Sequence, residues 1–215
     1  IYALNSCIVI ILLLVISIIS VFYLPDVIVE QLEALGIMNI FETVIPLVVS
    51  VLVCICCTTS ASLSLEGKSR WIMCSVPVKT ITVFNAKILV NLTVVLPILW
   101  ISLVLLRVAF PQTVIQTVFL FVTPTIYALF ISIIGMLLNV KYPRYDWTSE
   151  YYAVKGGAVS VLATIGVGLV LSAVPVYLCI FFRDHAQFIV ITVTVFIAII
   201  TFIAYRLLIK IRLYM

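Results

Sequence analysis

Six long apolar runs constrain this chain more than any other feature of its sequence. They cover approximately residues 2–24, 43–64, 86–106, 114–138, 158–181 and 187–208. A helix needs about 20 predominantly apolar residues to cross the hydrocarbon core of a bilayer, and each run has about that length. The alternation of apolar and polar residues that marks membrane barrels is absent. The sequence therefore predicts an all-α, polytopic membrane protein, with a single domain of six transmembrane helices over residues 1–215.

The composition excludes an ordinary water-soluble domain. The chain is 66% hydrophobic and only 9% charged, whereas globular domains are about 25% charged. Its formal net charge is +4, but the basic residues do not form runs with interleaved aromatics of the kind that grip phosphates. We therefore expect membrane lipid, and no nucleic acid, as a partner.

The basic residues are distributed unevenly among the connections. Ten lie after the second run, after the fourth run and in the tail, and only Arg107 and Arg183 lie in the other connections. The ten are Lys68, Arg70, Lys79, Lys87, Lys141, Arg144, Lys155, Arg206, Lys210 and Arg212. Because cytoplasmic loops carry the excess of Lys and Arg, this pattern predicts cytoplasmic N and C termini.

The connection between the first two runs is acidic. Within residues 27–40, Ile28, Leu32, Leu35 and Met38 fall at helical steps of three and four. This spacing is compatible with a short helix in the membrane interface, and an ordered polar loop is an equally good interpretation.

Two runs carry small residues at strict steps of four. The second run has Ser50, Cys54, Thr58 and Ser62, and the fifth run has Ser160, Thr164, Gly168 and Ser172. Small residues let helix backbones approach closely in lipid. We expect these stripes to form helix–helix seams, either within one bundle or at a dimer interface.

Ionisable residues are missing from the middle of every run. Carriers driven by protons or ions usually bind the coupling ion at such a residue, so the energy for any transport would come from elsewhere. Gly67-Lys68-Ser69 resembles the end of a phosphate-binding loop, but Ser62 stands where that pattern needs glycine. The sequence predicts no catalytic residue, no cofactor and no metal site, and hence no enzyme.

Two stretches in the predicted cytoplasmic connections combine charged and aromatic residues. In the first, Gly67 permits a sharp turn out of the second span, and residues 68–75 read as a short surface helix that Pro77 ends. The second, residues 139–150, contains Lys141, Pro143, Arg144, Asp146, Trp147 and Glu150. Both stretches have two possible roles: anchoring at the membrane surface or docking of a partner.

The same two stretches resemble a protein family. SLEGKSRWIMCSVPV, with Lys79 and residues 86–91 after it, is similar to the loop after the second span of bacterial ABC transporter permeases of the ABC-2 type. NVKYPRYDWTSE, with residues 154–155, looks like the next cytoplasmic loop in one branch of those permeases. The resemblance covers approximately residues 45–162.

This resemblance implies a permease subunit in the bacterial cytoplasmic membrane that exports its substrate. A separate ATP-binding ABC ATPase subunit would dock on a coupling segment, residues 66–77, and would hydrolyse the ATP. The docking residues would be Glu66, Gly67, Lys68, Arg70, Trp71 and Pro77. The working unit would be a homodimer, or this chain would be one half, the C-terminal one, of a longer permease.

A second class of function uses the same residues. A membrane interaction protein, such as an immunity or sensor subunit, would use the two cytoplasmic stretches to bind a partner and would transport nothing. Reconstituted transport would separate the two classes.

Overall fold

The computed structural model describes residues 2–23, 34, 38–69, 71, 75, 77–110, 112–148 and 159–211. Within these residues the regular structure is entirely helical, as the sequence predicts. The α-helices are α1 (Tyr2–Tyr23), α3 (Met38–Ile55), α5 (Thr80–Ala109), α6 (Val114–Lys141), α8 (Val159–Phe181) and α9 (Ala186–Lys210). Two short 3₁₀ helices, η1 (Ser64–Ser69) and η2 (Arg183–His185), lie after α3 and before α9.

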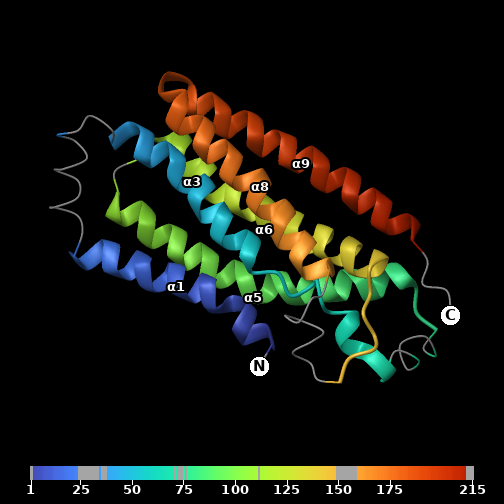
Figure 1. Cartoon of the computed structure of the whole chain (residues 1–215). Helices are drawn as coiled ribbons and strands as arrows, with labels where there is room; N and C mark the ends of the chain where they lie inside the picture. Colours follow the sequence, from blue (N-terminus) through green and yellow to red (C-terminus); the bar gives the residue numbers. More distant parts are fainter. Residues whose placement is uncertain are drawn as a thin grey trace.

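The helices form one elongated bundle (Figure 1). Helix α1 packs mainly along α5 at one side, and α9 packs mainly along α6 at the other. Helices α3 and α6 occupy the centre, where α3 contacts α8 and α6. Both marked chain ends lie toward the same end of the bundle as η1 (Figure 1). Successive helices therefore run in alternating directions.

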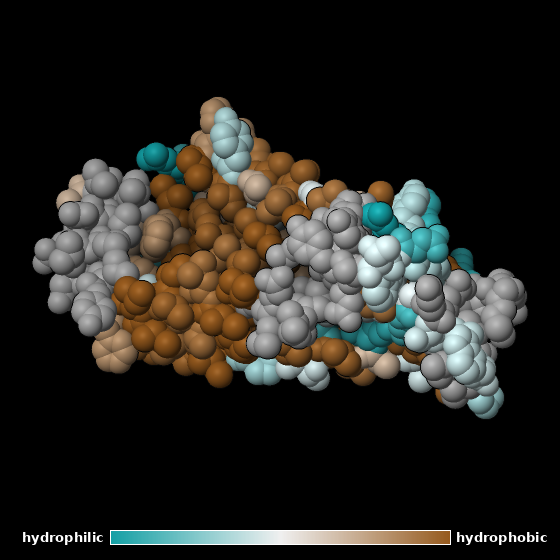
Figure 2. Space-filling model, turned by 60° about the horizontal axis from the view of Figure 1, so that its bottom comes forward, coloured by the Kyte–Doolittle hydropathy of each residue, from teal (hydrophilic) through white to brown (hydrophobic). Residues whose placement is uncertain are grey.

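Five of the described helical segments are long and apolar enough to cross a membrane. They are Met38–Ile55, Thr80–Ala109, Val114–Lys141, Val159–Phe181 and Arg183–Lys210. In α1 the apolar stretch Ile8–Phe22 is shorter than this criterion requires. On the face shown in Figure 2, apolar residues cover the middle of the bundle, and most of the hydrophilic residues lie toward the end that contains η1. This surface suits a multi-pass membrane protein, because lipid, unlike water, does not disfavour apolar side chains on the outside.

The second predicted span is wrong at both ends. Residues 43–64 were expected to form one helix, but α3 begins at Met38 and ends at Ile55. Beyond Ile55 the chain contains Cys, Thr and Ser, which are moderate helix formers whose side chains compete for backbone hydrogen bonds. The Thr58 amide donates to the side chain of Asn91 in α5 at 2.9 Å, and not to a backbone carbonyl one turn earlier as it would in a continuing helix. Residues 27–37, the remainder of the possible interfacial helix, lie outside the described residues except for Ala34.

Only one of the two stripes of small residues lies on a single helix face. The α8 stripe is buried along its whole length and forms a seam within the bundle. A Cβ added at Gly168 would lie 2.8 Å from Cys54 Cβ in α3 and 2.8 Å from Ile131 Cδ1 in α6. The other stripe is not a single helix face, because Ser50 and Cys54 belong to α3 whereas Thr58 and Ser62 follow its end.

Candidate functional site

The segment between α3 and η1, residues 56–63, is non-helical and almost entirely buried. We call it the connector. Cys56 is 1% exposed, and Thr59 and Ala61 are fully buried. A buried backbone without its own helix must satisfy its polar groups elsewhere, because hydrocarbon offers no hydrogen bonds. The partners of the connector come from α5, α6 and α8.

Asn91 of α5 holds the start of the connector. Its Oδ1 accepts hydrogen bonds from the backbone amide of Thr58 at 2.9 Å and from Thr58 Oγ1 at 2.8 Å. Its Nδ2 donates to Ser132 Oγ of α6 at 2.8 Å. In turn, Thr59 Oγ1 donates to the Ser132 carbonyl at 2.7 Å. One fully buried amide therefore joins the connector to two helices.

Asn139, near the end of α6, holds the far end of the connector. Its Nδ2 donates to the carbonyl of Ser60, which also accepts a hydrogen bond from Ser160 Oγ of α8 at 2.9 Å. Its Oδ1 accepts from the amide of Ser64 at 3.2 Å and from Ser64 Oγ at 3.3 Å. The amide of Asn139 thus spans the connector and the first residue of η1.

Gly135 is the point where α6 and the connector come closest. A Cβ at this position would lie 2.6 Å from Cys57 Sγ, 2.7 Å from Thr59 Oγ1 and 3.1 Å from the backbone nitrogen of Ser60. Real Cβ atoms do not make such contacts, so only glycine fits here without displacement of the connector. The close approach also lets Cys57 Sγ reach the Ile131 carbonyl at 3.3 Å.

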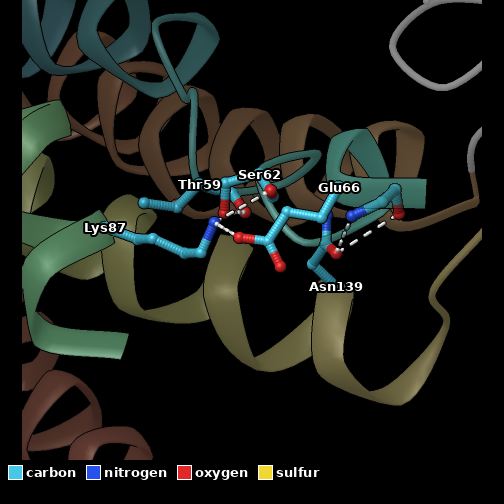
Figure 3. A network of polar contacts seen from close by, with 6 residues as sticks. Thr59, Ser62, Glu66, Lys87 and Asn139 are labelled. Carbon is cyan, nitrogen blue, oxygen red and sulfur yellow. Dashed lines mark hydrogen bonds and ion pairs between the residues drawn. The ribbon is translucent and has the colours of Figure 1, made fainter. Parts of the chain in front are cut away.

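An ion pair closes the polar network at the η1 end. Lys87 Nζ lies 2.7 Å from Glu66 Oε1 and donates to the Ser62 carbonyl at 3.0 Å. Figure 3 shows the two side chains pointing toward each other, beside Thr59 and Ser62. The side chains of Lys87 and Glu66 are only 20% and 27% exposed, so water screens this pair less than a surface pair.

Lys87 does not lie in the predicted cytoplasmic connection between the second and third runs. It lies within α5, which begins at Thr80, and its long side chain extends to η1.

A pocket of ≈ 350 Å³ lies between the connector and α5. Its lining combines polar Thr58, Ser62 and Lys87 with apolar Leu65, Ala86, Val90 and Val94.

The predicted docking residues divide into inward-facing and outward-facing groups. Glu66 is tied to Lys87, and Gly67 is buried against Trp147. Trp71 is 68% exposed, and Pro77 is exposed. Arg70 and the side chain of Lys68 lie outside the described part of the chain, as do residues 72–74. Within the predicted surface helix, residues 68–75, the described Trp71 and Ser75 are helical. Gly67 has a positive φ of 46° and kinks the chain, but it does so inside η1 and not at the end of the second span, because α3 already ends at Ile55.

The second predicted stretch lies directly against η1. Trp147 Nε1 donates to the Ser64 carbonyl at 2.7 Å, and the Arg144 amide donates to Ser64 Oγ at 3.0 Å. Lys141, Pro143 and Asp146 are exposed, and Glu150 lies outside the described residues. The two predicted cytoplasmic stretches therefore meet at Ser64, although about 80 residues separate them in sequence.

Two residues that hold the connector, Ser132 and Gly135, were not predicted, because they lie in an apolar run and have no distinctive spacing. Asn139 opens the predicted stretch 139–150, but it was not predicted to bind the segment after the second span. The signal that could have pointed to the connector is the run Cys-Cys-Thr-Thr-Ser-Ala-Ser, which is unusually polar for the inner half of a span. The burial of Glu42 was not predicted either. This residue was expected in the connection before the second span, but it stands in the second turn of α3 and is only 6% exposed.

The groups of this site are amides, hydroxyls, a thiol and one ion pair. Most of their contacts hold backbone atoms of the connector or of η1 against α5, α6 and α8. A comparison with family models, with curated proteins and with solved structures found no match. The function of this chain is therefore inferred from this geometry and from the sequence patterns.

Proposed function

We propose that this chain is the membrane-spanning permease subunit of an ATP-driven ABC transporter of the ABC-2 type, and that it acts as an exporter. It crosses the bacterial cytoplasmic membrane six times, with both termini in the cytoplasm. A separate ATPase subunit docks on the two cytoplasmic stretches and hydrolyses the ATP. The permease works as a homodimer or together with a second permease half.

One observation carries this function most directly. The two stretches that carry the family resemblance meet at one end of the bundle, and the connector ties their meeting point to α5, α6 and α8. A partner that pushes on this surface would therefore move backbone that reaches into the bundle. The basic residues favour the cytoplasm for this end, and both chain ends lie toward it.

Two features of the sequence agree with a separate ATPase subunit as the source of energy. None of the predicted spans has an acidic residue or histidine near its middle, and the nucleotide-binding pattern around Gly67 is incomplete. A permease powered by a separate ATPase needs neither feature in its own chain.

Trp71→Ala should abolish retention of the ATPase partner. Trp71 is 68% exposed, so its replacement removes contact surface without opening a core, and we expect at least tenfold less ATPase to co-purify. The measurement is affinity purification of the tagged chain in mild detergent, with cross-linking before solubilisation and identification of the retained proteins. Glu66→Lys would be a poorer test, because it also breaks the ion pair with Lys87.

Trp100→Ala is the matched control. Trp100 is 50% exposed, but it lies in the middle of α5 and donates to Thr125 on the neighbouring helix, away from η1. This variant should retain the ATPase. Purification of the unaltered chain free of any ATPase, with cross-linking included, would instead favour the membrane interaction protein.

A further inference from the structure

Ser64 is bound through all three of its polar groups to one segment of the chain. Its amide donates to Asn139 Oδ1 at 3.2 Å. Its hydroxyl oxygen accepts from the Arg144 amide at 3.0 Å, and its carbonyl accepts from Trp147 Nε1 at 2.7 Å. Because Ser64 is fully buried, these bonds are sheltered from competing water. The first residue of η1 is thereby fastened to residues 139–147.

The ring of Trp147 adds a steric contact to these hydrogen bonds. A Cβ at Gly67 would lie 2.9 Å from Trp147 Cζ2 and 3.1 Å from Trp147 Cε2. The indole therefore lies directly on the backbone of the turn, whose positive φ of 46° also favours glycine. Trp147 is half-buried, so one side of it is committed to η1.

We infer that η1 and residues 142–148 form a single rigid docking element, fastened by Trp147, so that a partner touching either loop displaces both together with the connector. Trp147 is a positioning residue in this element, since it acts through Ser64 and Gly67. The identification of the partner as an ATPase rests on the proposed function, whereas the attachment of η1 to residues 142–148 does not.

The exposed charges of the element and of the segment that leads into α5 indicate the kind of partner surface that fits. Among the described residues of these two segments, Lys79 and Arg144 are exposed and basic, and Asp146 is exposed and acidic. Lys141, which directly precedes the element at the end of α6, is also exposed and basic. Tyr142 and Val78 add exposed apolar area, at 46% and 50% exposure. The complementary surface is acidic, with an apolar recess for aromatic side chains.

Hydrogen exchange of the full chain in detergent tests the fastening without any partner. In Trp147→Ala we expect the amides of Ser64 and Arg144 to exchange at least tenfold faster, because each donates within the fastened contact. Trp147→Phe keeps an aromatic ring but loses the N–H donor and part of the contact with Gly67, so it should show a smaller increase than Trp147→Ala at the same two amides.

Trp100→Phe is the control, because it also removes an indole hydrogen bond, the 3.2 Å contact with Thr125, at a site outside the element. It should leave exchange at Ser64 and Arg144 unchanged. Faster exchange confined to residues 142–148 in Trp147→Ala, with Ser64 unaffected, would overturn the inference.

A second measurement separates this inference from the proposed function. If an ATPase co-purifies with the unaltered chain, Trp147→Ala should lower its retention at least tenfold, as Trp71→Ala does. Full retention in Trp147→Ala, combined with loss in Trp71→Ala, would contradict a single docking element but leave the ATPase partner in place. Coupled exchange in a chain that retains no ATPase would support the element and count against the proposed function.

Discussion

Gly135→Ala is expected to destabilise the protein by about 1–3 kcal/mol, the range found when a well-packed core is overfilled. The added methyl group would lie 2.6 Å from Cys57 Sγ, 2.7 Å from Thr59 Oγ1 and 3.1 Å from the Ser60 backbone nitrogen. The two closest atoms belong to side chains, but turning them away would break their hydrogen bonds to the Ile131 and Ser132 carbonyls. The third contact is with the connector backbone. Its carbonyl at Ser60 is already held by Asn139 and Ser160. Thermal unfolding in detergent would measure the loss.

Gly166→Ala is the matched control for this prediction. Gly166 also lies inside a helix, α8, but a Cβ there would meet no atom within 4 Å. Alanine is favoured over glycine in a helix interior by about 0.5–1 kcal/mol, so this variant should be as stable as the parent or slightly more stable. Equal loss of stability in both variants would show that α6 does not approach the connector as described.

Asn91→Leu is expected to have a comparable or larger effect, about 3 kcal/mol of lost stability. Leucine has a similar size but cannot accept from the Thr58 amide and hydroxyl or donate to Ser132. Leaving a buried polar group without its partner costs about 1–3 kcal/mol, and this site is fully buried. Thermal unfolding gives the loss of stability, and hydrogen exchange at Thr58 reports whether the connector has been released.

Thr93→Leu provides the comparison for Asn91→Leu. Thr93 stands two residues further along α5, is exposed, and bonds only within its own helix, to the Val90 carbonyl. The substitution makes the same helix more apolar without touching the connector, so it should change stability by less than about 0.5 kcal/mol. A large loss in both variants would mean that α5 tolerates no added apolar residue, and the role assigned to Asn91 would not stand.

The sequence predicted the helical class and most helix bounds because those depend on local properties. Long apolar runs give α5, α6, α8 and α9 to within a few residues, apart from the early start of α5 at Thr80. The turn at Gly67 was also predictable, since glycine alone adopts a positive φ without cost. Both features are encoded within a few neighbouring residues.

The early end of α3 was not predictable in this way. Residues 43–64 are long and apolar enough for a span, and their polar run Cys-Cys-Thr-Thr-Ser-Ala-Ser does not by itself say where the helix ends. The contact that competes with the helix comes from Asn91, 33 residues away from Thr58. Similarly, Trp147 and Ser64 are 83 residues apart, so no spacing rule brings them together. The two predicted docking stretches could be found from composition, but the contact between them at Ser64 depends on the tertiary arrangement of α3 and α6.

The most direct test of the proposed function is site-specific photo-crosslinking in living cells. A benzophenone amino acid would replace Val78 in one variant and Tyr142 in another, because these exposed positions lie in the two different stretches. Val108, which is 69% exposed near the far end of α5, would serve as the control position. Cross-linked products are purified through the tagged chain and identified by mass spectrometry.

The account predicts that the same ATP-binding protein is captured from Val78 and from Tyr142, and that it is absent from the Val108 product. Capture from both positions would establish a cytoplasmic ATPase seated across the two stretches. Products containing no ATP-binding protein at either position, from cells in which the tagged chain is correctly inserted, would contradict the assignment as an ATP-driven permease.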